Sequence, residues 1–248
     1  MPEWKDKIIL LSSKPFGETG MLVSVLSKYN GRYKSFVYGG NSIKKRSIFQ
    51  KGNICRAEWK ARISEQMGSI KLELVKSTST DFFNQPINLT ALSAICEISD
   101  FILPEREPNT KIFTATLSLF DLLKLSSEKD YDWIKGYVKW EIGVLSELGF
   151  SLKLNKCAVN GNKENLSFVS PKTGRAVSLK EGLPYKDKLL ILPKFLGGNY
   201  NFSCQITDLI LFLNLKKYFL NINFFNNNKI PNSRIRLEKQ LEMKILKV

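Results

Sequence analysis

The chain has 248 residues with 43% hydrophobic and 11% aromatic content, which is enough for a substantial core divided between two domains. Its 38 Lys and Arg residues against 23 Asp and Glu residues give a formal net charge of +15, which favours nucleic acid or an anionic membrane surface as the partner. The sequence has no histidine and no Gly-x-x-x-x-Gly-Lys-Ser/Thr loop, which excludes Ser-His-Asp and Cys-His catalysis and argues against nucleotide hydrolysis.

The charge is unevenly distributed along the chain. Residues 1–80 carry 15 basic and 6 acidic side chains, residues 81–150 carry 6 and 11, and residues 151–248 carry 17 and 6. Two basic zones therefore flank an acidic middle, which predicts separate contact surfaces. No run of about 18 apolar residues occurs, and the N-terminus lacks the apolar core of a signal peptide, so we expect a cytoplasmic protein without a membrane partner.

The first 76 residues show strand-like alternation in five short segments. Glycine and Asn-Gly turns separate these segments, as is typical of a small all-β domain. Five strands in about 75 residues predict an OB-type barrel, a closed sheet that binds oligonucleotides across one face, with a small β-sandwich as the alternative. The expected strands are Lys7–Lys14, Met21–Leu26, Arg32–Tyr38, Asn53–Arg62 and Ser69–Lys76.

Within this domain, cations and aromatic residues are interleaved between Gly31 and Arg62. Cations neutralise phosphates, and flat rings stack on unpaired bases, so this composition predicts a nucleic-acid-binding surface. A Gly39-Gly40 turn leads into part of the set and suits a mobile loop that grips phosphates. The candidate nucleic-acid-binding residues are Arg32, Lys34, Lys44, Lys45, Arg46, Arg56, Lys60 and Arg62.

The alternation of residue types predicts which side chains face the core. In the fourth strand, small apolar residues share one parity with Trp59, which we expect in the core, while Arg56 and Lys60 face water. In the third strand, Lys34, Phe36 and Tyr38 share the parity of Arg32. The two rings could stack on bases or pack against a neighbouring domain, and the sequence leaves both interpretations open.

From about Asn88 the hydrophobic period changes from 2 to 3.6, which predicts helices. A helical stripe ends at Pro104, and a later helix is stopped by Gly149. Residues 155–185 are rich in Asn, Gly, Lys and Pro and read as a hairpin insertion. The expected helices are Asn88–Leu103, Ile112–Leu125, Asp132–Leu148, Thr207–Phe219 and Ser233–Lys247.

Short motifs along the chain resemble the bacterial RecO family of DNA repair proteins. No single motif is specific, but their order is, and they cover most of the chain. They are Gly17-Glu18-Thr19, Tyr29-Asn30-Gly31-Arg32, Tyr38-Gly39-Gly40 before Lys44-Lys45-Arg46, Gly52-Asn53 and Trp59, followed by Leu148-Gly149-Phe150, Cys157-Ala158-Val159-Asn160-Gly161, Phe168-Val169-Ser170-Pro171, Gly174-Arg175-Ala176-Val177 and Arg234-Ile235-Arg236-Leu237.

The resemblance implies an α+β multidomain protein with an OB-fold over residues 1–80 and a helical domain over residues 81–248. It further implies a recombination mediator without covalent catalysis, cytoplasmic and associated with the nucleoid. Such a protein binds single- and double-stranded DNA and anneals complementary strands. With RecR it helps to load RecA onto DNA coated by the single-stranded DNA-binding protein, whose acidic C-terminal tail is a further partner. For that tail we consider Lys216 and Lys217, beside Leu213 and Phe219.

Many family members carry a four-cysteine zinc finger where the 155–185 hairpin lies. Here Cys157 stands at the first ligand position, but Asn160 replaces the second, and Ala176 and Val177 stand where the remaining pair would be. A single thiolate cannot hold a tetrahedral zinc ion, so we expect a degenerate, metal-free finger and no cofactor.

Three alternative functions are compatible with the residues. An RNA-binding OB module needs the same cations and rings. An adaptor would recruit other repair proteins and touch DNA only weakly. A magnesium-dependent nuclease could be built on Asp100, Glu105 and Glu107, although these acids flank Pro104 at a helix end, an ordinary solvated setting.

Overall fold

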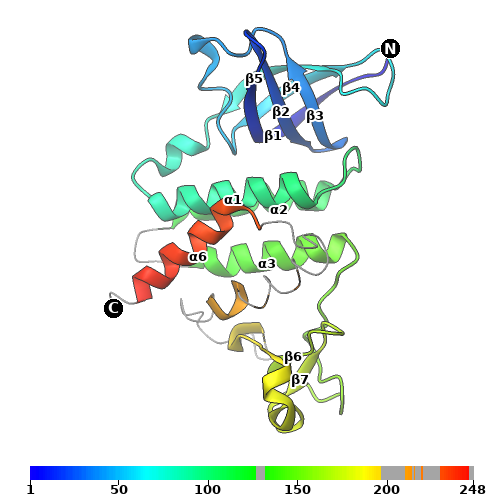
Figure 1. The fold of residues 1–248 in the computed structure, drawn as a ribbon, viewed down its shortest axis with the longest axis vertical. Coiled ribbons are helices and arrows are strands. Elements are labelled where there is room, and N and C mark those ends of the chain that lie inside the picture. The colour runs from blue at the N-terminus through cyan, green and yellow to red at the C-terminus, as the bar shows by residue number, and fades with distance from the viewer. Residues whose placement is uncertain (127–131, 197–209, 214, 216–218, 220–229, 246–248) are drawn as a thin grey trace. The chain divides into compact units, whose positions relative to one another are not determined.

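The computed structural model describes residues 1–126, 132–196, 210–213, 215, 219 and 230–245 (Figure 1). The chain forms two compact units, one comprising residues 1–125 with 231–237 and the other residues 126–230 with 238–248. The expected division at residue 80 falls inside the first unit, because the two helices that follow the sheet pack with it.

A closed five-stranded barrel forms the N-terminal part of the first unit, and the prediction of an OB-fold is confirmed (Figure 1). The strand order around the barrel is β1-β2-β3-β5-β4, and β4 pairs with β1 to close it. All pairings are antiparallel except β3 with β5, which is parallel. The strands are β1 (Glu3–Phe16), β2 (Gly20–Ser27), β3 (Gly31–Val37), β4 (Ile54–Lys60) and β5 (Ser69–Lys76).

Strand β1 is longer at both ends than the alternation predicted. Its first half pairs with β4 and its second half with β2, and the register with β2 shifts between Leu10 and Ser12. Such an irregularity bends a strand, which lets one chain segment serve two neighbours around a barrel. The alternation did not reveal these ends because charged residues surround Trp4 at the first end and Lys14, Pro15 and Phe16 are all exposed at the second.

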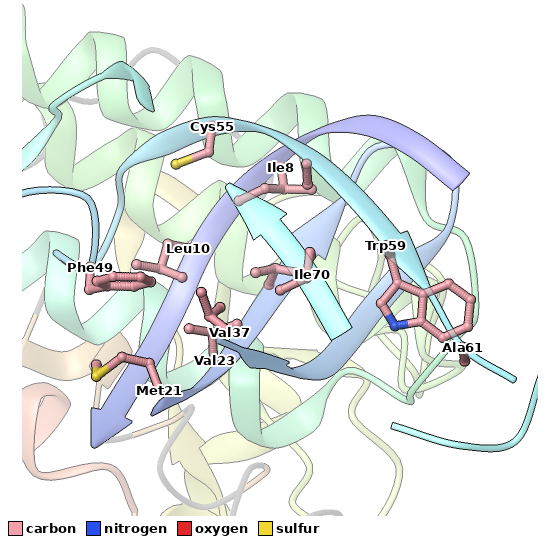
Figure 2. Packing of buried hydrophobic residues seen from close by; sticks show 12 residues of the cluster. Ile8, Leu10, Met21, Val23, Val37, Phe49, Cys55, Trp59, Ala61 and Ile70 are labelled. Carbon is pink, nitrogen blue, oxygen red and sulfur yellow. The ribbon is translucent and has the colours of Figure 1, made fainter. Parts of the chain in front are cut away.

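The barrel encloses a hydrophobic core of residues from all five strands and from the loop after β3 (Figure 2). Trp59 is 3% exposed, as predicted, and its indole N–H donates to the Met67 carbonyl at 3.0 Å. The rings of Trp4 and Tyr33 pack against Trp59 with centroids 6.0 and 5.1 Å away. Burial of a large apolar side chain contributes about 1.5–3 kcal/mol, so this core is the main stabilising element of the barrel.

Two helices complete most of the first unit, after a short 3-10 turn, η2 (Ser79–Phe82). Helix α1 (Pro86–Ile102) has proline in its first turn, and it ends before Pro104 because Leu103 is already extended. Helix α2 (Thr110–Leu125) is capped by Asn109, whose side-chain oxygen accepts the Ile112 N–H at 2.9 Å. Helix α1 lies against β1, where the Ser12 hydroxyl donates to Asp100 at 2.7 Å.

The second unit contains α3 (Asp132–Glu147), whose predicted aromatic stripe of Trp133, Tyr137 and Trp140 is buried, and Gly149 follows with φ of +88°. The hairpin predicted within residues 155–185 is present as β6 and β7, and a third strand beyond residue 185 extends it to a small sheet of order β7-β6-β8. The elements of this region are β6 (Leu166–Val169), β7 (Ala176–Ser178), α4 (Leu179–Gly182), η3 (Leu183–Lys188), β8 (Leu190–Ile191) and η4 (Lys194–Leu196). The chain ends with α6 (Asn232–Ile245), which both units share.

Candidate nucleic-acid interface

Three aromatic rings form an exposed cluster on the outer face of the barrel, and we call Phe16, Phe36 and Tyr38 the aromatic ledge. The ring centroids of Phe16 and Phe36 are 5.7 Å apart and those of Phe36 and Tyr38 are 4.6 Å apart, both edge to face. Phe16 is 59% exposed and Tyr38 is 75% exposed. Exposed rings that hold one another in place can receive a stacked base at little ordering cost.

The pairing of the first three strands brings these rings together. Phe16 is paired with Gly20 across the β1–β2 turn, and Phe36 is paired with Leu22 on β2. A side chain at Gly20 would collide with the Phe36 ring, so glycine here allows that ring to lie against the backbone of β2. In OB-folds the outer face of strands 2 and 3, with the loop between strands 1 and 2, is the oligonucleotide-binding face.

A loop that carries cations is fastened beside this ledge. The Asn41 N–H donates to the Thr19 carbonyl at 2.9 Å, and the Asn41 side chain donates to the Glu18 carbonyl at 3.3 Å. These bonds tie the loop to the β1–β2 turn, next to Phe16. The loop then forms a single 3-10 turn, η1 (Ile43–Lys45).

Lys45 and Arg46 in this loop are exposed, and neither has an ion-pair partner among the described residues. The end of the loop is fixed by Asn53, whose side-chain N–H groups donate to the carbonyls of Ser47 at 2.7 Å and Ile48 at 3.1 Å. The side chain of Lys44, which the sequence grouped with these cations, lies outside the described residues.

The sequence predicted Arg32 to be part of the nucleic-acid-binding surface, but in the structure this side chain is buried. It is 8% exposed, and its Nε donates to the Leu103 carbonyl at 2.7 Å. Its two Nη atoms contact Asp100 at 3.4 Å and Glu105 at 3.3 Å. The guanidinium is thus occupied in joining β3 to the end of α1, so we leave Arg32 out of the interface.

The same contacts bear on the acidic residues that could have formed a magnesium site. Asp100 and Glu105 are both paired with Arg32, and Glu105 also contacts Lys34 Nζ at 3.3 Å. In the part of the chain that the structure describes, no three His, Cys, Asp or Glu side chains come together in a way that could hold a metal ion. The nuclease alternative has no geometric support.

The outer face of β4 carries Arg56, Glu58 and Lys60, as predicted, and acidic residues of the neighbouring strands lie among its cations. Glu58 forms an ion pair with Lys5 at 2.6 Å, and this hydrogen bond, with the charge of Lys5, lowers the pKa of the exposed Glu58 carboxyl. Strand pairing sets Glu73 opposite Arg56 and Glu3 opposite Lys60. The exposed Arg62 follows in the turn before β5.

In the finger-like hairpin, the Cys157 sulfur accepts the Ser178 N–H at 3.3 Å. Burial raises the pKa of this thiol, but backbone N–H groups of Asn160 and Ser178 outweigh burial and lower it. The Asn160 side chain accepts the Asn162 N–H at 3.0 Å, while Ala176 and Val177 are buried apolar residues. One sulfur among such neighbours does not fit tetrahedral zinc.

The sequence did not reveal Phe16 as part of the candidate site, because it lies beyond the predicted end of its strand. A Phe followed by Gly-Glu-Thr before a strand that starts with glycine was the available signal, but only the register places it beside Phe36. Lys216 and Lys217, considered for an acidic tail, lie outside the described residues. Among the described residues, no helix is both long and apolar enough to cross a bilayer.

Comparison with known proteins supports the family suggested by the motifs. Two family models match the chain, Recombination protein O N terminal over residues 1–78 and Recombination protein O C terminal over residues 84–207. The chain is 42% identical to the DNA repair protein RecO of Rhodospirillum centenum, covering 94% of this chain and 92% of that protein. It is 37% identical to the RecO of Rhodospirillum rubrum, covering 97% of both, and 35% identical to that of Wolbachia pipientis wMel, covering 93% and 97%. The chain therefore belongs to the RecO family of DNA repair proteins, which act in recombination as mediators and not as enzymes.

Proposed function

We propose that the barrel binds single-stranded DNA across the aromatic ledge, with Lys45 and Arg46 on the phosphates. The observation that carries this proposal is the juxtaposition of exposed rings with cations that have no acidic partner among the described residues. Rings supply stacking energy that does not depend on sequence, and cations supply counterion release. Lys34, 48% exposed beside Glu105, extends the cationic margin, and Lys44 remains a candidate from the sequence alone.

We infer further that the protein binds single- and double-stranded DNA and anneals complementary strands. Two strands repel one another through their phosphates, so a protein with more than one basic zone neutralises both and raises their local concentration. Arg56, Lys60 and Arg62 on the β4 side are the candidates for a second, weaker contact. No proton transfer or cofactor is needed for this activity.

The wider role proposed is to help load RecA, together with RecR, onto DNA coated by the single-stranded DNA-binding protein. The acidic tail of the single-stranded DNA-binding protein is expected to bind a cationic site with apolar neighbours, for which Lys216 and Lys217 remain candidates. A cytoplasmic protein associated with the nucleoid fits this role. These partners come from the family resemblance, and the ledge supports the DNA contact alone.

Annealing of two complementary DNA strands, each coated with the cognate single-stranded DNA-binding protein, tests this function. Fluorescence would be followed over a salt series without metal or nucleotide. We expect acceleration that declines as salt rises, because the contacts are largely electrostatic. Binding without acceleration would contradict the annealing proposal and favour an adaptor, and tighter binding of a matched RNA oligomer would favour the RNA-binding alternative.

A further inference from the structure

Strands β3 and β5 pair with each other over a short distance only. Their ladder has a single described pair, Phe36 with Ser69, and the Phe36 N–H donates to the Gly68 carbonyl at 3.1 Å. Strand β3 ends one residue later, at Val37, whereas β5 continues to Lys76. Beyond this pair, β5 therefore has β4 on one side and no described strand on the other.

The free side of β5 presents backbone hydrogen-bonding groups. In a strand, every second residue directs its N–H and C=O groups to the same edge, so those of Ile70, Leu72 and Leu74 face the side on which Gly68 meets β3. Across this edge, no hydrogen bond joins the backbone of Leu72 or Leu74 to another described part of the chain. An edge of this kind is a template for a further strand.

The space beside this edge is accessible. A cavity of about 940 Å³ adjoins it, and the lining includes Ser69–Leu72 of β5, Val37 at the end of β3 and Phe49 of the following loop. Leu72 and Leu74 are only half-buried, although they pack against the core of the barrel. A strand placed beside β5 would remove more of their apolar surface from water, which favours association.

The side chains of β5 form a self-complementary pattern. Ile70, which points into the barrel core (Figure 2), Leu72 and Leu74 alternate with the exposed Lys71 and Glu73. When two copies of β5 pair antiparallel about a two-fold axis at Leu72, Lys71 of each copy lies opposite Glu73 of the other. Ile70 then lies opposite Leu74, so apolar residues also meet. Opposite charges across a strand pair attract, and both ends of the pairing gain such a pair.

The neighbouring registers are less favourable. A two-fold axis at Lys71 would set the two lysines opposite each other, and an axis at Glu73 would set the two glutamates opposite each other, which is destabilising. The pairing of β5 with β4 also shifts register after Leu74, and such an irregularity bends an edge away from further pairing. The charges therefore favour the one register in which residues 70–74 of each strand pair.

We propose that β5 is a self-association edge, along which two copies of this chain form a two-fold symmetric dimer through residues 70–74. The pairing satisfies the free backbone groups of both copies, covers the half-buried leucines and forms two Lys71–Glu73 contacts. A ladder this short gives a weak dimer, with a Kd on the order of 10 μM. The net charge of +15 on each copy opposes association at low salt.

A dimer of this kind would bring two aromatic ledges, one from each copy, into one assembly. Two bound DNA strands would then be held together, which raises their effective concentration for annealing. This consequence rests on the proposed function, whereas the pairing of β5 does not and is measured without DNA. A protein that dimerises and fails to anneal strands would contradict the proposed function and support the dimer.

Sedimentation velocity of the full chain tests the dimer, over protein concentrations on both sides of that Kd and at a salt concentration that screens the net charge. We expect a reversible monomer–dimer equilibrium. Lys71→Glu and Glu73→Lys should each weaken it about tenfold, because two attractive pairs become repulsive. The two variants change the net charge in opposite directions, so a loss in both does not come from net charge. A monomer at every concentration, or an unchanged dimer in both variants, would overturn the proposal.

Mixing the two variants tests the register. In a heterodimer of the Lys71→Glu chain with the Glu73→Lys chain, opposite charges face each other again, so we expect association with roughly the parent affinity. Lys71 and Glu73 also lie opposite residues of β4, but each chain keeps its own change in the mixture, so restored pairing excludes local destabilisation as the cause of the loss. Lys7→Glu on β1 is the charge control and should leave the dimer unchanged. Failure of the mixture to associate would overturn the proposed register.

Discussion

The barrel presents two basic faces that look alike in the sequence and differ in the structure. On the face of β2, β3 and the following loop, exposed rings adjoin Lys45 and Arg46, which have no ion-pair partner among the described residues. On the face of β4, Arg56 and Lys60 are set opposite Glu73 and Glu3 by strand pairing. We expect the register of the sheet, as well as the number of cations, to influence where a phosphate binds, because acidic residues opposite a cation weaken its attraction for an anion.

The largest expected effect comes from reversing the loop charges. Lys45→Glu with Arg46→Glu should weaken binding of a thymidine oligonucleotide about a hundredfold at low salt, with a smaller difference at high salt, because each phosphate contact releases counterions. Fluorescence anisotropy over a salt series measures this effect. The matched variant Arg56→Glu with Lys60→Glu makes the same charge change on β4 and should cost about fivefold, and an equal loss in the two variants would break the comparison.

A tenfold weakening is expected from Tyr38→Ala, because stacking of one base on an aromatic ring is worth about 1–3 kcal/mol. This loss should persist at high salt, which distinguishes it from the charge reversal. Tyr29→Ala is the control, since that ring is 60% exposed but lies in the β2–β3 turn with Lys28 over its face at 4.6 Å. If both variants lost affinity equally, the ledge would have no special role.

A smaller change should follow when an acidic residue is removed from the β4 face. Glu58→Gln should raise DNA affinity about twofold at low salt, since Lys5 is then released for a phosphate. Lys5 lowers the pKa of the Glu58 carboxyl from 4.5, so any stability from the pair is present above that ordinary value and is lost as pH falls through the lowered pKa.

The chain contains no histidine, so DNA affinity measured between about pH 6 and pH 8 should stay flat. A change of DNA affinity with pH within that range would contradict the assignment of the contacts to lysine and arginine side chains.

The smallest effect on DNA affinity is expected at Arg32. Arg32→Gln should leave oligonucleotide binding unchanged and lower the free energy of unfolding by about 2 kcal/mol, because the Leu103 carbonyl loses its donor and the partly buried Asp100 loses its cationic partner. Urea unfolding and anisotropy together measure the two quantities. Lys34 lies two residues from Arg32 on the same face of β3 and is half exposed. Lys34→Gln should have the opposite effects, weakening DNA binding about twofold without lowering the free energy of unfolding.

The local elements could be predicted from the sequence because each depends on nearby residues. The alternation around Trp59 identified its strand and its burial, and proline and glycine marked the ends of α1 and α3. The burial of Arg32 could not be predicted, because its partners Asp100, Leu103 and Glu105 are about seventy residues away. Phe16 was missed for a similar reason, since the bend in β1 sets its neighbours.

The short pairing of β3 with β5 also could not be predicted from the alternation of residue types. Alternation specifies which side chains face the core, but it carries no information about how far two parallel strands overlap. The pairing of Phe36 with Ser69 depends on how all five strands close into a barrel. The sequence therefore predicted the basic loop and the rings of β3, but not how far β3 and β5 overlap.

The junction around Gly31 and Arg32 limits how the protein can be divided. Gly31 has φ of +82°, and a side chain there would collide with the backbone of Glu107, while the Arg106 N–H donates to the Arg32 carbonyl at 2.8 Å. A truncated gene that stops after β5 would encode a barrel whose Arg32 guanidinium has lost all three of its oxygen partners. Expression of residues 1–80 alone should therefore give an aggregation-prone product, whereas a fragment that continues through α2 keeps the three oxygen partners of Arg32.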